Sequence, residues 1–190
     1  MAVDFRDEAP AILKDYLIYK QTIKNMSKKT VDEYFIDLRT FFRFLKVMRG
    51  LVPDGTEFDE IKIDDVDLDL IKTVNLELAY DYMNFLYRDR NNKSASRARK
   101  CSSLKGFFKY ITNNKHLLDT NPVEQLESPK NKKALPKYLT LEQSIELLNA
   151  VDGSNKQRDY CILTLFLNCG LRVSEMAGLN YNDIHSDGTM

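Results

Sequence analysis

SKKTVDEYFIDLRTFFRFLKVM, residues 27–48, is the stretch that decides the fold. Its apolar residues recur at steps of three and four, which is the spacing of one face of an amphipathic helix. Ser27 precedes them, where a serine side chain can accept a hydrogen bond from the first backbone amides of a helix. The stretch therefore predicts one long helix with one buried face, formed by Val31, Tyr34, Phe35, Leu38, Phe41, Phe42, Leu45 and Met48.

Further helices are predicted on both sides of this one. One covers residues 9–25, a second is capped by Asn75 and broken at Asn91, and a third begins at Ser94 or Ser96 and ends at Asn113. A short helix is expected near residues 68–71. No convincing period-two strand pattern precedes residue 120, so the sequence predicts a compact bundle of four main helices.

The basic, proline-containing stretch at residues 127–138 predicts a linker between two domains, residues 1–126 and 139–190. After it, Thr140 and Gln143 form a capping-box pattern. Residues 160–167 are apolar except for Thr164, which predicts a helix at the centre of a domain. We expect a short helix at 174–177 and a strand from residue 181. Since the second domain stops in mid-architecture, we expect the sequence to be a truncated piece.

The charge of the chain is polarised, although 28 basic and 28 acidic residues leave it formally neutral. Residues 93–137 contain eleven bases and three acids, a net charge of +8, whereas residues 54–69 contain eight acids and one lysine. Such a distribution attracts a polyanion to one face of the protein. The alternative is a solvated surface on which charges cluster by chance.

Composition excludes several other classes of protein. No apolar stretch is long enough to span a bilayer, and the acidic N-terminus is not typical of a secretory signal. Three cysteines do not make a disulfide framework, and two histidines with scattered cysteines do not predict a zinc site. We therefore expect a protein of the reducing cytoplasm with no membrane contact and no metal.

Residues 168–179, NCGLRVSEMAGL, resemble the G-L-R-x-S-E-x-x-x-L motif of the tyrosine recombinases, also called the phage integrase family. Residues 27–41 resemble the family's S-x-x-T-x-x-x-Y-x-x-D-L-x-x-F helix, and residues 121–122 and 128–140 resemble its linker. The likeness covers nearly the whole chain and is greatest to Xer-type recombinases and mobile-element integrases. It implies a mainly α fold, in which a four-helix, SAM-like core-binding bundle precedes the helical start of a mixed α/β catalytic domain.

The resemblance also implies a chemistry. These enzymes recombine DNA at specific sites through a 3′-phosphotyrosine intermediate and need no cofactor. Arg172 would bind the reacting phosphate and Glu175 would support it. The alternatives are that Arg172 caps the preceding helix or pairs structurally with Glu175, and that Glu175 is an ordinary first-turn acid. The family's later residues, including H-x-x-R and the tyrosine nucleophile, have no match here, and His185 has Gly188 three residues on instead of arginine. We therefore expect these 190 residues alone to be inactive.

The implied partner is a double-stranded DNA recombination site, on which the full-length protein would act as a tetramer, the 190-residue chain being monomeric without DNA. Lys93, Arg97, Lys100 and Ser103 are expected to project together from one helix face, opposite the apolar face. A non-enzymatic DNA-binding protein of the same fold and a helical protein-interaction module remain as alternatives. The candidate DNA contacts are Lys28, Lys29, Thr30, Arg39, Lys93, Arg97, Lys100 and Lys105, with Lys132, Lys133 and Lys137 in the linker.

Overall fold

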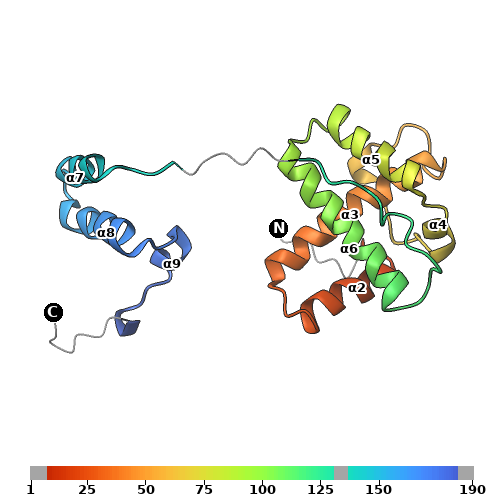
Figure 1. Ribbon diagram of the computed structural model, residues 1–190, viewed down its shortest axis with the longest axis horizontal. Coiled ribbons are helices and arrows are strands. Elements are labelled where there is room, and N and C mark those ends of the chain that lie inside the picture. The colour runs from red at the N-terminus through yellow and green to blue at the C-terminus, as the bar shows by residue number, and fades with distance from the viewer. Residues whose placement is uncertain (1–7, 131–136, 184–190) are drawn as a thin grey trace. The chain divides into compact units, whose positions relative to one another are not determined.

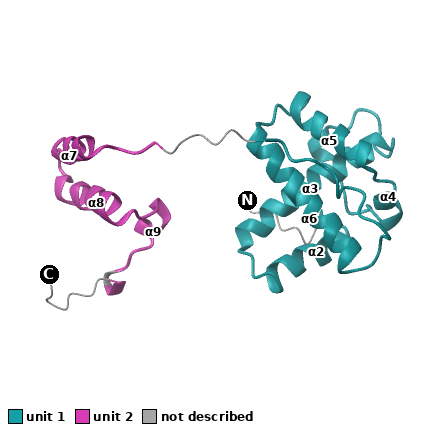
Figure 2. Ribbon diagram, viewed as in Figure 1, with its two compact units in different colours: residues 1–132 teal, residues 133–190 magenta. Residues whose placement is uncertain are grey.

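A computed structural model describes residues 8–130 and 137–183 of the 190-residue chain. It divides into two compact units, residues 1–132 and 133–190 (Figure 2). The division falls within the stretch that the sequence predicts to be a linker, and we describe each unit by itself.

Unit 1 consists of helices, as the sequence predicted (Figure 1). Its main helices are α2 (Ala11–Thr22), α3 (Lys28–Met48), α5 (Leu76–Arg88) and α6 (Ser94–Asn113), and the short ones are η1 (Phe58–Glu60) and α4 (Leu68–Lys72). The predicted starts of α3 and α5 are confirmed, because the side chains of Ser27 and Asn75 accept hydrogen bonds from the amides of Thr30 and Leu78. No described residue of either unit lies in a strand.

Helices α3 and α6 form the centre of unit 1. The predicted apolar face of α3 is buried except for Tyr34, which is half-buried, and Met48, which is exposed. Against it pack the rings of Phe107 and Phe108 from α6, largely edge to face, at centroid distances of 5.5 Å from Phe42 and 6.2 Å from Phe41. Aromatic pairs in this geometry stabilise a core beyond their buried area.

The contacts between α3 and α6 also fix their relative direction. Along α3 the partners in α6 advance in the same order: Arg99 meets Glu33, Ser103 meets Asp37 and Phe107 meets Phe42. The two helices therefore cross while running in the same general sense, and in Figure 1 both begin on the left of unit 1.

The acidic stretch at residues 54–69 is an integral part of unit 1. Three of its apolar residues, Ile61, Ile63 and Val66, are buried. Cations of α3 and of the turn after α5 pair with its acids: Lys46 Nζ lies 2.7 Å from Asp65, and Arg90 Nη2 lies 3.1 Å from Asp59. The stretch is thus packed against the end of α3 that is opposite to Lys28.

Unit 2 contains α7 (Leu141–Asn149), α8 (Lys156–Cys169), α9 (Val173–Ala177) and η2 (Tyr181–Asp183). The predicted capping box is confirmed, because the side chains and amides of Thr140 and Gln143 bond reciprocally. Gly170 ends α8 in the left-handed conformation, with φ of 62°, which glycine adopts without strain.

Two predictions for unit 2 were wrong. Residues 181–183 form a 3₁₀ turn, not the start of a strand, and residues 184–190 lie outside the described part of the chain. Helix α8 is present, but it is not the centre of a core: Tyr160 is 47% exposed, and no described residue of α7, α8 or α9 is fully buried. The reason is that, among the described residues of unit 2, α8 packs chiefly against α7, which covers only part of its surface.

Among the described residues, no helix combines the length and the apolar character needed to cross a bilayer.

Candidate nucleic-acid interface

The two central helices both begin with basic residues. Lys28 and Lys29 form the start of α3, and Lys93 is the N-cap residue of α6; all three are exposed, and neither helix has an acid in its first turn. This is the reverse of what stabilises a helix, because the partial positive charge at a helix N-terminus favours acids there. The lysines and both helix dipoles therefore concentrate positive potential on the side where α3 and α6 begin.

Arg97 adds a further charge one turn into α6. Its guanidinium carbon lies 4.6 Å from the centroid of the Tyr87 ring. No carboxylate of the described residues lies within ion-pair distance of it. Thr30 is exposed at the start of α3, where its hydroxyl lies 2.9 Å from that of Ser27. The structure thus places Lys28, Lys29 and Thr30 in the first turn of α3, and Lys93 and Arg97 at the start of α6.

Lys100 does not belong to this group, and its predicted exposed position is wrong. Its ammonium lies 3.0 Å from Oδ1 of Asp37, and only 8% of the residue is exposed. Ser103, one turn further along α6, donates to the other oxygen of Asp37 at 2.7 Å. The physical reason is the rotation of α6, which turns the face carrying Lys100 and Ser103 toward α3.

Asp37 is the residue that sequence reasoning missed. Its side chain is completely buried and also accepts an ion pair from Arg99 at 2.9 Å. A carboxylate is retained in a protein interior only when it is paired and hydrogen-bonded. The available signal was its place between Phe35 and Leu38, an acid within an otherwise apolar helix face.

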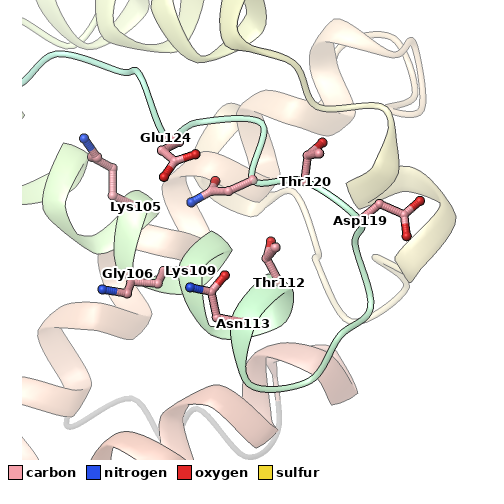
Figure 3. Close-up of a pocket in the computed structure, with 9 residues that line it drawn as sticks. Lys105, Gly106, Lys109, Thr112, Asn113, Asp119, Thr120 and Glu124 are labelled. Atoms are coloured by element: carbon pink, nitrogen blue, oxygen red, sulfur yellow. The ribbon is translucent and has the colours of Figure 1, made fainter.

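Two other candidates are engaged elsewhere. Arg39 pairs with Glu8 at 2.8 Å. Lys105 donates to the backbone oxygen of Leu126 at 2.9 Å and lines an open cavity of about 610 Å³ between α6 and residues 119–124 (Figure 3). Because Asp119 and Glu124 also line this cavity, it is poorly suited to a polyanion.

The linker lysines are only partly placed. Lys137 is exposed, and Lys132 and Lys133 lie outside the described residues.

Arg172 and Glu175 lie at the start of α9, directly after Gly170 ends α8. Arg172 Nη1 is 2.9 Å from one carboxylate oxygen of Glu175, and the Arg172 amide donates to the other oxygen at 2.8 Å. Both hydrogen bonds lower the pKa of Glu175 below its ordinary value, and the bond from the Arg172 backbone amide has the larger effect. The Arg172 side chain is 81% exposed, so the pair holds the guanidinium at the surface of unit 2.

Comparison with known proteins bears on this arrangement. The model of the phage integrase family matches residues 137–190. The tyrosine recombinase XerC of Caldanaerobacter subterraneus subsp. tengcongensis is 49% identical over 94% of this chain and 50% of its own length. The XerC proteins of Myxococcus xanthus and Syntrophus aciditrophicus are 32% and 31% identical, over 93% and 91% of this chain and 53% and 52% of their own.

The chain thus spans about half the length of the curated relatives that it matches. No solved structure matches it significantly. The relatives are similar across both units, and the family model covers the residues around Arg172. The chain is therefore similar to the tyrosine recombinases of the phage integrase family, and among them to the XerC proteins.

Proposed function

We propose that the chain is the DNA-binding and first catalytic part of a site-specific tyrosine recombinase. The observation that carries this proposal is that α3 and α6 begin on the same side of unit 1. The cations there, Lys28, Lys29, Lys93 and Arg97, have no acidic partner among the described residues. Two helix N-termini and four cations on one side of a bundle form a surface for the phosphates of duplex DNA. Lys137, Lys132 and Lys133 would follow the backbone from the linker.

Arg172 supplies the catalytic part of the proposal. Its guanidinium presents parallel N–H donors that suit the non-bridging oxygens of a phosphodiester, and Glu175 holds it in position. Charge on those oxygens increases when a tyrosine attacks the phosphorus, so a fixed cation stabilises the transition state. The bond energy is kept in the phosphotyrosine intermediate, so rejoining the strand needs no nucleotide cofactor.

The whole protein would act on two DNA sites as a tetramer. The 190-residue chain would bind DNA as a monomer and would not cleave it alone, because Arg172 and Glu175 are the only residues here that match the family's catalytic motifs.

The first prediction tests DNA binding by the 190-residue chain. Its affinity for a duplex of random sequence is expected to fall with salt at a log–log slope of about −3.6, at roughly −0.9 for each of about four phosphates. Replacing both Lys28 and Lys29 with alanine removes two contacts and reduces the slope to about −1.8. Fluorescence anisotropy at several salt concentrations measures these slopes.

The matched control is the double variant Lys62→Ala/Lys72→Ala, which removes two exposed lysines of unit 1 that lie away from the start of α3. It is expected to bind as the unmodified chain does. Equal losses in both double variants, or an affinity that does not depend on salt, contradict the proposal and favour a helical protein-interaction module.

A further inference from the structure

Arg97 and Arg99 lie two residues apart on α6 but differ in their electrostatic surroundings. Arg99 Nη1 pairs with Glu33 at 2.6 Å and its Nη2 pairs with Asp37 at 2.9 Å, so two carboxylates neutralise it. Arg97 has no carboxylate partner among the described residues. Its positive charge is therefore uncompensated within unit 1.

An aromatic ring supports the Arg97 guanidinium. Tyr87 lies near the end of α5, and its ring centroid is 4.6 Å from the guanidinium carbon, within the range of a cation–π contact. The Nε atom of Arg97 is buried yet has no hydrogen-bond partner in the described structure. Among the described residues, the guanidinium is thus held by the ring of Tyr87, and no side-chain hydrogen bond competes with this contact.

This arrangement suits an anion with several oxygens. A guanidinium that packs against a ring still offers its N–H donors at the edge, in the parallel geometry that phosphate oxygens accept. The site lies one turn into α6, where the helix dipole is positive and the first turn carries no acid. Since the guanidinium is already held, binding loses less side-chain entropy than it would with a free arginine.

We propose that Tyr87 is a positioning residue, which holds Arg97 ready to bind a phosphate of the DNA backbone. This inference rests on the proposed function, because it takes duplex DNA as the ligand of the surface where α3 and α6 begin. Tyr87 itself would not touch DNA. Tyr87 is 60% exposed, so its replacement leaves the aromatic core of unit 1 intact.

The test compares variants of the 190-residue chain by their affinity for duplex DNA over a range of salt concentrations. Tyr87→Ala is expected to bind about fivefold more weakly at every concentration. Without the ring, the Arg97 guanidinium is no longer held in place, so binding must order it. Its salt slope should stay the same, since Arg97 keeps its charge. Arg97→Ala should lower the slope by about 0.9, the value for one phosphate.

Three further variants separate the ring from other effects. Tyr87→Phe keeps the aromatic face and should bind normally, whereas Tyr87→Leu keeps apolar volume without that face and should behave as Tyr87→Ala does. Tyr80→Ala is the matched control, because Tyr80 is another exposed tyrosine of α5, seven residues earlier, and no cation packs against it in the described structure. It should bind as the unmodified chain does.

The outcomes distinguish this inference from the proposed function. If Arg97→Ala weakens binding and both Tyr87→Ala and Tyr87→Leu bind normally, the positioning role is wrong and DNA binding stands. If Tyr87→Ala causes a further loss in the Arg97→Ala background, Tyr87 contacts DNA itself and the positioning role is again wrong. If the unmodified chain does not bind DNA, the proposed function fails, and the inference fails with it.

Discussion

Asp37 lies in the middle of the apolar face of α3, and its buried carboxylate organises the basic residues of α6. It holds Lys100 and Arg99 by ion pairs and Ser103 by a hydrogen bond. Two of the bases that make residues 93–137 so positive are therefore part of the packing between two helices. Charge counted along the sequence overstates the charge that a polyanion would meet.

The second prediction concerns this residue. Asp37→Asn is expected to destabilise unit 1 by about 3 kcal/mol at neutral pH, because it leaves the ammonium of Lys100 buried without its counter-charge. Urea unfolding followed by circular dichroism measures the change. Asp32→Ala is the control, since Asp32 also lies on α3 and its side chain has no hydrogen bond or ion pair among the described residues; it should change stability by less than about 0.5 kcal/mol. A loss of the same small size for Asp37→Asn would contradict the structural role of the cluster.

Helices α2 and α6 approach each other closely at Gly106. A Cβ atom at this position would lie 2.7 Å from the hydroxyl oxygen of Tyr16. That hydroxyl is buried and has no hydrogen-bond partner among the described residues, and burial raises the pKa of Tyr16 far above its ordinary value. Glycine in a helix interior normally costs about 1 kcal/mol relative to alanine, so its presence here follows from the contact between the two helices.

The third prediction uses both residues. Gly106→Ala is expected to lower stability by about 1 kcal/mol, because the clash with Tyr16 outweighs the gain in helix propensity. Tyr16→Phe removes the hydroxyl and should be neutral or stabilising, since that group is buried without a partner. In the double variant the alanine should become stabilising. Thermal unfolding of the four proteins measures this coupling, and an alanine that stabilises the otherwise unmodified chain would refute it.

The elements that the sequence predicted well are those with local signals. The starts of α3, α5 and α7 follow from the side chains of Ser27, Asn75 and Thr140, each of which bonds three residues away. The burial of Lys100 and the exposed position of α8 could not be predicted in the same way. They depend on which face a helix turns toward a partner distant in sequence, and helical spacing alone does not contain that information.

At the scale of the whole molecule, the residues proposed for DNA binding and the residues proposed for catalysis lie in different units. Unit 1 has its own aromatic core and the cations at the start of α3 and α6. Unit 2 contributes Arg172, held at its surface by Glu175. Binding and catalysis should therefore respond separately to substitutions in the two units.

The fourth prediction tests this separation in the full-length protein, on duplexes selected for binding from a random library. Arg172→Ala is expected to slow strand cleavage about a hundredfold, the scale for loss of one preorganised donor to the transition state, and to change duplex affinity little. The readout is the covalent protein–DNA complex on a nicked duplex. Arg158→Ala is the control, because Arg158 is an exposed arginine of the same unit that pairs with Asp159. Cleavage by the Arg172→Ala variant at the normal rate would leave Arg172 with only a structural role.

The position of the first turns of α3 and α6 has a consequence for how such proteins diverge. Residues 28–30 precede Val31, the first buried residue of α3, and Lys93 precedes Cys101, the first buried apolar residue of α6. Exchanges at exposed positions alter stability by only about 0.5 kcal/mol, so these turns can accumulate substitutions while the aromatic core is preserved. A lineage can therefore change the strength of the proposed contact with DNA phosphates by altering a few surface residues, without passing through intermediates that fail to fold.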